Sequence, residues 1–572
     1  MKKNKNLKRV LISLLVLTTV FVSAFSFAYA DSSSDTSVTE TSTSQSQPGN
    51  PPSGDPPSGG PGGSGGGTPP DKPDGDSSGG PGGTPPDGAP GGSGGSGGSS
   101  SADISYTGNT EFTSDTTESG QTYTSGESNV QALLVSGGTS TIDKATVTKT
   151  GDSDGDESDF YGTNAAVLAT SGTLNITDSE ITTDGAHANA VFATGEGVIE
   201  ISDSAIITTS NNSGAVMVTG GGTLTANNVT AKTSGNSPAP IRSDRGGGTM
   251  TINGGSYESN GVGSPVVYST ADITVNNANM VSTASEGVVV EGKNSVTLNG
   301  VTMTADNNTH NGKSETYKAI FLYQSMSGDA DEGTASFTAK DSEINVLNGD
   351  TIFVTNTTAE IYLENNTITN ESGDFLRIQT GAWGNEGSNG GNVTATLSNQ
   401  RIEGDIIVDS ISTLDLTLEK GSKLFGAIDT DNQAQEVNLT MSADSVLVLQ
   451  GDTYVDSLTN EDSTNSNIYL NGYKLYVNGE ETAANEGTYT EDEAVSEETA
   501  EETTDTAAAG GNTTLPYVIG GIILLVLAGS AVAASKKKAS RETASEVDLQ
   551  EKIPETVPEE NTETSSGKTD KE

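Results

Sequence analysis

A short apolar segment returns eleven times between about residues 104 and 480. Successive copies start 34, 24, 25, 24, 26, 23, 31, 32, 24 and 31 residues apart, so a period near 24 carries insertions of seven to ten residues. A repeat of this kind is typical of a solenoid, in which the inserted residues form loops on one side. The copies start at Ala132, Ala166, Ala190, Ala215, Ala239, Pro265, Val288, Ala319, Thr351, Phe375 and Ile406.

Two further short strands are expected in each period. In the first of them apolar and polar residues alternate, as in residues 174–176, which indicates one buried face. Two residues after its last apolar position stands an Asp, Asn or Gly, and these residue types accept a positive φ. We therefore expect one tight turn, repeated along the chain and followed by the third strand. The turn positions are Asp178, Asp203, Asn228, Gly254, Asn277, Gly300, Asp341 and Asn365.

The pattern predicts an all-β fold, a right-handed parallel β-helix (solenoid) over residues 104–480, with disordered flanks and one C-terminal transmembrane helix. One rung, meaning one circuit of three strands, buries too little alone, whereas stacking on its neighbours covers its apolar faces and pairs its backbone. An antiparallel sandwich also uses short strands, but it does not explain a three-strand unit that returns with the same turn chemistry. The right hand is expected because parallel crossover connections are right-handed.

The two ends of the chain suggest export and membrane anchoring. Residues 1–30 have the layout of a cleavable signal peptide, with five basic residues before an uncharged run that closes with Ala-Tyr-Ala; an uncleaved anchor is the alternative. The uncharged run 515–534 has 20 residues, enough to cross a hydrocarbon core of roughly 30 Å. Basic residues follow it at once, so we expect a single-pass type I protein of the cell membrane, mostly extracellular, with a cytoplasmic tail at 535–572.

Two segments beside the solenoid have compositions that bury almost nothing. In residues 48–100, 43 of 53 residues are Gly, Pro or Ser, so we expect residues 31–103 to form a disordered arm. Between Glu480 and Asp505 there are 11 acidic residues and no basic one. Repulsion between these charges predicts an extended acidic stalk over residues 481–514.

The charge and the missing cysteines exclude several classes of function. A formal net charge of −50 repels nucleic acid, whereas an acidic surface can collect cations. With no Cys, the chain has no disulfide, thiolate metal site or Cys nucleophile.

The repeated rungs, including their Asn and Asp turns, resemble the right-handed parallel β-helix surface proteins of Gram-positive bacteria, which share the architecture of the pectate-lyase-like superfamily. The resemblance covers roughly residues 104–480 and implies a fold without implying a reaction. Polygalacturonases of this superfamily use clustered Asp residues, a Gly-His-Gly and an Arg-Ile-Lys. Neither His187 nor His310 lies between two glycines here, and Gln379 stands where the Lys after Arg377 and Ile378 would be. These catalytic motifs are absent, which argues against that activity, and no catalytic residue is assigned.

A calcium site is a possible use of one acidic cluster. Alternate Asp residues imitate the start of an EF-hand loop, but Glu157 and Thr163 stand where that loop needs Gly and Glu, so the EF-hand is excluded. A looser calcium site and a solvated insertion loop are both open. The candidate ligands are Asp152, Asp154, Asp156 and Asp159.

Pectate lyases need an Arg that acts as the base beside a calcium ion held by carboxylates. The best candidate in this chain for such a site is an enlarged turn that contains Arg242, Asp244 and Arg245. The structural alternative is that Asp244 caps the turn and pairs with the flanking Arg side chains.

A stripe of candidate ligand-binding residues is expected on the first sheet of the solenoid. If Ile241 and Ile352 point inward, alternation sends their neighbours outward, and flat rings with hydrogen-bonding groups suit a pyranose polymer. In the opposite register the Phe residues would fill the core. Trp383, the only Trp, either packs as a cap or serves as a binding ring. The stripe consists of Arg242, Tyr268, Glu291, Phe321, Phe353, Phe375 and Arg377.

Together these features lead us to expect a membrane-anchored cell-surface protein for adhesion or extracellular polysaccharide binding. Its expected partners are the cell membrane and an extracellular polysaccharide or host surface, with no nucleic acid, and its only possible cofactor is calcium. A diverged polysaccharide lyase or hydrolase, and a passive structural protein of the cell envelope, are the alternatives.

Overall fold

The computed structural model describes residues 104–491, except residues 313, 326 and 372. The predicted signal peptide (1–30), disordered arm (31–103), transmembrane helix (515–534) and cytoplasmic tail (535–572) lie outside these residues.

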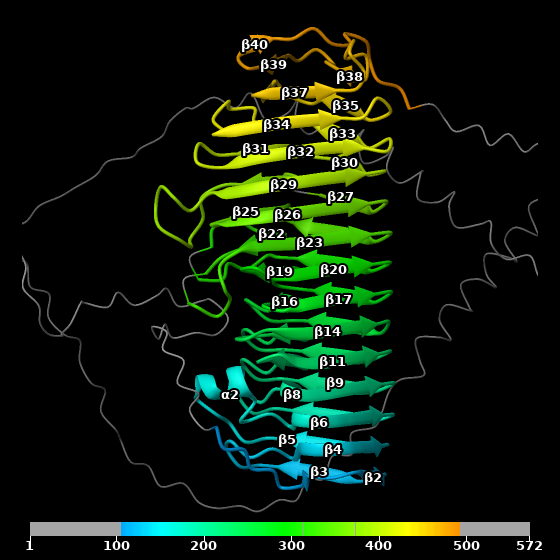
Figure 1. The fold of residues 1–572 in the computed structure, drawn as a ribbon, viewed down its shortest axis with the longest axis vertical. Coiled ribbons are helices and arrows are strands. Elements are labelled where there is room, and N and C mark those ends of the chain that lie inside the picture. The colour runs from blue at the N-terminus through cyan, green and yellow to red at the C-terminus, as the bar shows by residue number, and fades with distance from the viewer. Residues whose placement is uncertain (1–103, 313, 326, 372, 492–572) are drawn as a thin grey trace, which may run out of the picture. The chain divides into compact units, whose positions relative to one another are not determined.

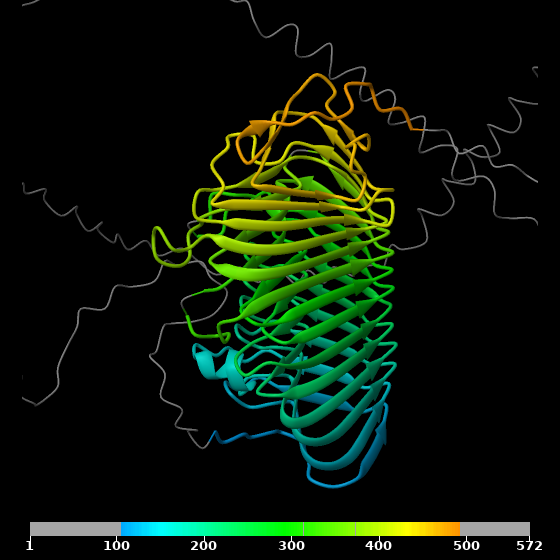
Figure 2. The ribbon, with the colours of Figure 1, turned by 45° about the horizontal axis from the view of Figure 1, so that its top comes forward.

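Strands of successive rungs pair in parallel from β1 to β39, and the described segment forms a β-solenoid of about 15 turns (Figure 1). For example, β10 (Val216–Thr219) pairs with β8 (Val191–Ser202) on one side and with β13 (Ile241–Ser243) on the other. The tilted view in Figure 2 shows these strands side by side from rung to rung. The predicted parallel β-helix architecture and its period are therefore confirmed.

The three strands of a rung form three faces, which we name A, B and C in chain order. Face A contains β1 (Glu111–Phe112), the first parts of β4 (Leu133–Asp143), β6 (Val167–Thr177) and β8, then β10, β13, β16 (Val267–Ser269), β19 (Val288–Glu291), β22 (Lys318–Tyr323), β25 (Asp350–Thr355), β28 (Leu376–Ile378) and β31 (Ile406–Val408). Face B contains β2 (Thr116–Ser119), the second parts of β4, β6 and β8, then β11 (Gly222–Asn227), β14 (Gly248–Asn253), β17 (Asp272–Asn276), β20 (Ser295–Asn299), β23 (Thr334–Lys340), β26 (Thr357–Glu364), β29 (Gly391–Ser398), β32 (Thr413–Glu419), β34 (Glu436–Met441) and β37 (Ser457–Asn460).

Face C is a separate sheet of ten strands, which a sheet of four strands follows. The ten are β3 (Thr122–Ser125), β5 (Thr146–Lys149), β7 (Glu180–Thr183), β9 (Ala205–Thr208), β12 (Thr230–Thr233), β15 (Ser256–Ser259), β18 (Asn279–Ser282), β21 (Thr302–Asp306), β24 (Glu343–Asn348) and β27 (Thr367–Asn370). The four are β30 (Arg401–Glu403), β33 (Lys423–Gly426), β35 (Val446–Leu449) and β38 (Ile468–Tyr469).

The tight turn between faces B and C repeats as predicted. All eight predicted positions have a positive φ, from 48° at Asp178 and Asp203 to 67° at Gly254. The residue before the turn adds side-chain bonds between rungs: the amide of Asn276 donates to Asn253 at 3.0 Å, and that of Asn299 donates to Asn276 at 2.9 Å. These bonds satisfy polar groups at a corner where the backbone changes direction.

The interior is a continuous apolar column filled by the alternate residues of each strand. Ile252, Val275 and Leu298 pair in register on neighbouring strands of face B, and all three are fully buried. Because each rung covers the apolar side of the next, the stack supplies burial that a single rung lacks.

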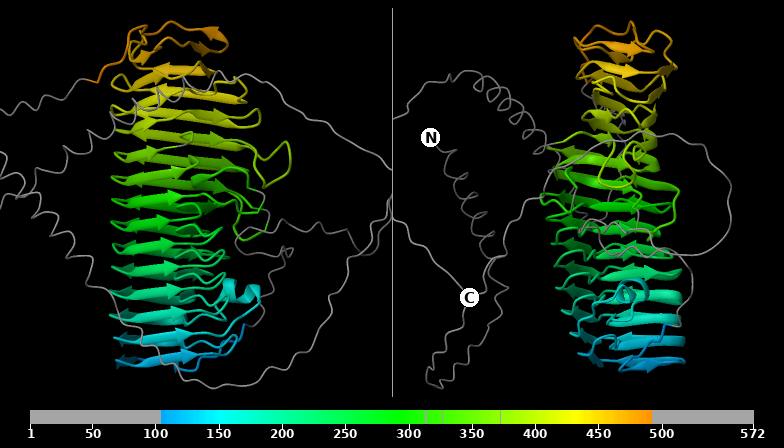
Figure 3. Two further views of the ribbon diagram at one scale, coloured as in Figure 1. Left: turned by 180° about the vertical axis from the view of Figure 1, so that it is seen from behind. Right: turned by 90° about the vertical axis from the view of Figure 1, so that its left-hand side faces the viewer.

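Four insertions leave the two corners that flank face A and project on that side of the stack (Figure 3). The first contains the helix α2 (Asp156–Tyr161), and the second is the loop 307–317 between β21 and β22. The third, 324–333, joins β22 to β23, and the fourth, 379–390, joins β28 to β29. The predicted looping of extra residues to one side is thus observed.

The C-terminal end of the stack carries a small sheet made of β36 (Thr453–Val455), β39 (Leu475–Val477) and β40 (Glu480–Glu481), in which β39 and β40 are antiparallel. Tyr489 packs against Phe425 and Tyr469. The folded part therefore includes residues 481–491, which the sequence analysis assigned to the acidic stalk; the rest of that stalk lies outside the described residues.

One part of the predicted fold class is corrected. It joined the solenoid to a C-terminal transmembrane helix, but none of the helices within 104–491 has the length and apolar character needed to cross a membrane.

Candidate functional site

The outer side of face A carries the predicted column of side chains. Ile241 and Ile352 lie in the interior, and Arg242, Tyr268 and Phe353 lie on the opposite side, at matching positions of β13, β16 and β25. The inward register assumed for the stripe is thus observed, except that Phe375 joins the interior cluster.

The stripe is not open to solvent. Arg242 is 0% exposed, Glu291 1%, and Tyr268 and Phe353 2% each, because residues from the insertions pack over them. Leu168, Phe192 and Met217 form one apolar cluster on this outer side, and Phe321, Phe353 and their neighbours form a second that Trp383 contacts. The role of the stripe residues in ligand binding stays a prediction, and it would require the covering loops to move.

Arg242 lies in a buried ionic cluster beneath α2. Its guanidinium is 3.1 Å from Asp244 and 3.5 Å from Asp159, a helix residue that also contacts His187 Nδ1 at 2.8 Å. Burial raises the pKa of Asp244 to about 8, against the lowering effect of Arg242 and with the help of the neighbouring Asp329 and Asp159 carboxylates. An Arg held in this way is a packing and pairing residue, with no exposed nitrogen to offer a polymer.

The turn after Arg242 has the capped arrangement considered from the sequence. The Asp244 carboxylate accepts a hydrogen bond from the backbone N–H of Arg245 at 2.9 Å. The Arg245 side chain crosses to another insertion, where its Nε donates to Asp329 at 2.6 Å, and its guanidinium lies 3.8 Å from the centre of the Phe160 ring. Arg245 therefore ties α2 to the loop 324–333.

Glu291 and Arg377, also predicted for the stripe, have partners within the fold. The Glu291 carboxylate accepts hydrogen bonds from the hydroxyls of Tyr268 and Tyr323, the latter at 2.8 Å. Arg377 is paired with Asp350 at 2.6 Å and with Asp374.

The predicted calcium ligands stay a prediction, and the structure describes the side-chain surroundings of three of them. Asp152 is exposed and accepts a hydrogen bond from the Ala186 N–H at 2.8 Å, Asp154 is exposed, and Asp159 is buried against Arg242. Asp156 is the first residue of α2. Among the side chains that the structure describes, no group of three or more acidic or His residues is arranged to hold a metal ion.

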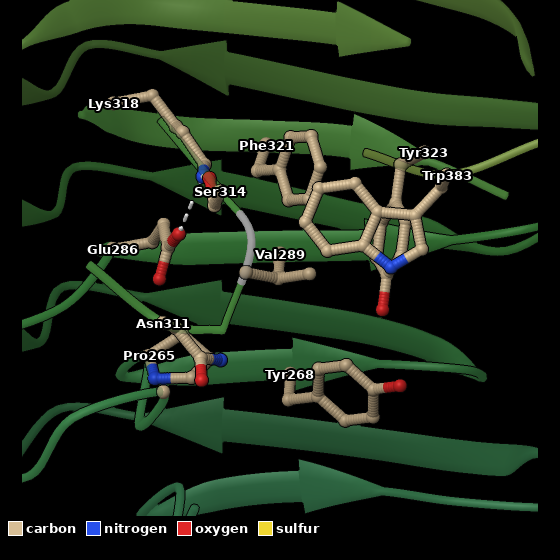
Figure 4. Close-up of a pocket in the computed structure, with 11 residues that line it drawn as sticks. Pro265, Tyr268, Glu286, Val289, Asn311, Ser314, Lys318, Phe321, Tyr323 and Trp383 are labelled. Carbon is tan, nitrogen blue, oxygen red and sulfur yellow. Dashed lines mark hydrogen bonds and ion pairs between the residues drawn. The ribbon is translucent and has the colours of Figure 1, made fainter. Parts of the chain in front are cut away.

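A small cavity lies between the outer side of face A and Trp383 (Figure 4). Its volume is about 20 Å³, which is room for about one water molecule. Lys318 Nζ lies 3.2 Å from Glu286, 2.6 Å from the Ser314 hydroxyl and 4.5 Å from the centre of the Phe321 ring.

The Ser314–Lys318 contact is part of a buried polar cluster that also contains Glu286. Burial raises and the Lys318 ammonium lowers the pKa of Glu286, and the net direction is down. Lys318 is the ion-pair partner of this buried carboxylate, and Ser314 completes the cluster by accepting a hydrogen bond from Lys318 Nζ.

The larger opening is a cleft of about 400 Å³ at the corner between faces A and B. Its walls come from three successive rungs, because Thr334 of β23, Thr358 of β26 and Asn392 of β29 are neighbours in register. With strands about 4.8 Å apart, the first and third of these strands are separated by about 10 Å. The lining residues are Gln324, Glu332, Gly333, Thr334, Asn356, Thr357, Thr358, Asn385, Ser388, Gly390 and Asn392.

Trp383 fixes one wall of this cleft. Its ring lies 5.2 Å from that of Phe321 and 5.0 Å from that of Tyr323, centre to centre. The Asn389 amide donates to the Trp383 carbonyl at 2.9 Å, so the loop that supplies Asn385 and Ser388 is anchored to face A at its middle. Trp383 thus packs as a cap, one of the two roles considered from the sequence.

Sequence reasoning missed the cleft because six of its eleven lining residues lie in the insertions 324–333 and 379–390, which have no apolar periodicity. The sequence did contain one signal for insertions in this region: three of the four repeat periods longer than 30 residues fall between Val288 and Ile406.

No family model, no curated protein and no solved structure matches this chain. The assignment as a parallel β-solenoid rests on the strand pairing described above.

Proposed function

We propose that this chain is an extracellular, surface-associated β-helix protein that binds polysaccharide through the cleft between loops 324–333 and 379–390. The observation that carries the proposal is the lining of that cleft, in which every residue is either Gly or has a polar side chain. Amide and hydroxyl groups both donate and accept hydrogen bonds, which matches the hydroxyl groups of a sugar ring.

The shape of the cleft supports a polymer as the ligand. The cleft crosses three rungs and opens to solvent, so a chain could extend along the stack beyond the cleft itself. Seven of the lining residues are exposed, namely Glu332, Gly333, Thr334, Thr358, Asn385, Ser388 and Asn392. Contacts of this kind are individually weak and add up over several sugar units.

Export is part of the proposal. It is supported by the basic and apolar N-terminal pattern of residues 1–30 and by the resemblance of the rungs to surface proteins of Gram-positive bacteria. Adhesion would follow if the bound polysaccharide belongs to another cell or to a matrix.

The proposal is tested by measuring binding of the purified chain to a panel of soluble oligosaccharides and insoluble polysaccharides. For a ligand found in this way, Asn385→Ala combined with Asn392→Ala should weaken binding about tenfold, because each lost hydrogen bond contributes about 0.5–1.5 kcal/mol. The matched control is Asn236→Ala, an exposed Asn between β12 and β13, several rungs away. Absence of binding to every polysaccharide, or equal losses in both variants, would contradict the proposal.

A further inference from the structure

We infer that the polysaccharide bound in this cleft carries free amino groups, as in a partly or fully deacetylated hexosamine polymer. The inference rests on the proposed function and adds the chemical class of the ligand. Two properties of the cleft lead to it: the sign of its charge and the engagement of the nearby cations.

The charge around the cleft is negative. Glu332 is the only ionisable residue of the lining, and no Lys, Arg or His contributes to it. Glu386 is exposed on the loop 379–390, and Glu360 is exposed two residues beyond Thr358 on β26. None of these three carboxylates forms an ion pair with any residue of the described chain.

The nearby cations are already occupied. Lys293 is paired with Asp331 at 2.8 Å, and Arg377 with Asp350 and Asp374. A polyuronate would bring further carboxylates to a site that has no free cation to receive them. The formal net charge of −50 for the whole chain also repels an anionic polymer.

Gln324 lines the cleft but is itself almost completely buried. Gln324 is 8% exposed, and its Nε2 donates to the carbonyls of Ser325 at 3.1 Å and Ala330 at 3.3 Å. Its Oε1 forms no hydrogen bond with the described residues. That oxygen is itself buried, beside Gly292, so the group of this cleft that is open to a ligand is the unpaired Glu332 carboxylate. An ammonium group has three N–H donors and no acceptor, which suits such a carboxylate.

The experiment compares three soluble hexamers with the same mature chain: glucosamine, N-acetylglucosamine and galacturonate. Binding is measured by calorimetry and by the fluorescence of Trp383, the only Trp in the chain. At mildly acidic pH and low salt, the glucosamine hexamer should bind at least fivefold more tightly than its N-acetylated form. High salt should reduce that ratio, because screening weakens exposed charge pairs.

Two variants locate the effect. Glu332→Gln should weaken binding of the glucosamine hexamer about twofold to fivefold, the range expected for one exposed ion pair, and should leave binding of the N-acetylated hexamer unchanged. Glu180→Gln, at an exposed Glu of β7 on face C, is the control and should change neither.

The outcomes separate the two proposals. Tighter binding of the N-acetylated hexamer or of the galacturonate hexamer would overturn the inference and leave polysaccharide binding standing. Equal affinities for the glucosamine and N-acetylglucosamine hexamers, with no effect of Glu332→Gln, would also overturn the inference and leave polysaccharide binding standing. If none of the hexamers and no other polysaccharide binds to the folded chain, the proposed function fails as well.

Discussion

Phe321 is the side chain of face A that packs against Trp383 of the loop 379–390, and we predict that its replacement by Ala has a local and measurable effect. The Phe321 side chain is 4% exposed and lies at the centre of an aromatic cluster. Its ring is 4.5 Å from that of Tyr323, 5.5 Å from that of Phe353 and 5.2 Å from that of Trp383. Phe321→Ala removes all three contacts together with the contact to Lys318 Nζ.

The expected cost is about 3–5 kcal/mol, as for other buried Phe→Ala changes. The three lost ring contacts contribute about 0.5–1.5 kcal/mol each beyond area burial, so they supply much of that cost. Because a solenoid distributes its stability rung by rung, the cost should appear as opening of the loop 379–390, with distant rungs unchanged.

Trp383 reports this opening directly, since no other Trp contributes to the emission. In Phe321→Ala the emission of the folded chain should shift to longer wavelength, and the amide hydrogens of residues 379–390 should exchange faster. Phe192→Ala is the matched control: Phe192 is also a buried Phe on the outer side of face A, but it lies beside Gly162, at the end of α2. An unshifted emission in Phe321→Ala, or an equal shift in Phe192→Ala, would refute the view that Phe321 anchors the loop.

Three further predictions concern other parts of the stack. Burial raises the pKa of Asp244 to about 8 in the folded state, against 3.8 in the unfolded chain, so Asp244 binds its proton more tightly when the chain is folded. The stability of the fold should therefore fall as pH rises from 3.8 to about 8 and stay level above that, and Asp244→Asn should flatten this part of a plot of Tm against pH. Arg242→Met leaves Asp159 buried without its guanidinium partner and should cost about 3–5 kcal/mol of stability, measured by chemical denaturation. Asn277→Val places a β-branched residue at a φ of 53° and should lower stability by about 1–2 kcal/mol, whereas Asn277→Gly should be tolerated; equal Tm values for the two variants would contradict this.

The features of the fold that the sequence allowed us to predict are those set by local chemistry. The positive φ at Asp178 and Asn277 follows from the residue type and its place after a strand, and it needs no knowledge of distant residues. The inward direction of Ile241 and Ile352 likewise follows from alternation, once the period is known.

The exposure of the stripe could not be predicted, because it depends on where insertions return. Arg245 contacts Asp329, 84 residues further along the chain, and nothing periodic connects the two. The sequence therefore indicated an open column, whereas Arg242 and Phe353 lie beneath loops. The cleft was missed for a similar reason: Asn385 and Asn392 became neighbours of Thr358 only through strand register between rungs and loop closure.

The antiparallel pair β39–β40 changes what the C-terminal end of the stack can do. A bare parallel edge would be a template onto which another copy could add its first rung, and repeated addition would give a fibre. With the chain reversed at β40, that edge no longer offers the hydrogen-bond pattern an incoming parallel strand requires. The antiparallel return of the chain therefore protects one sheet at this end of the stack against end-to-end addition.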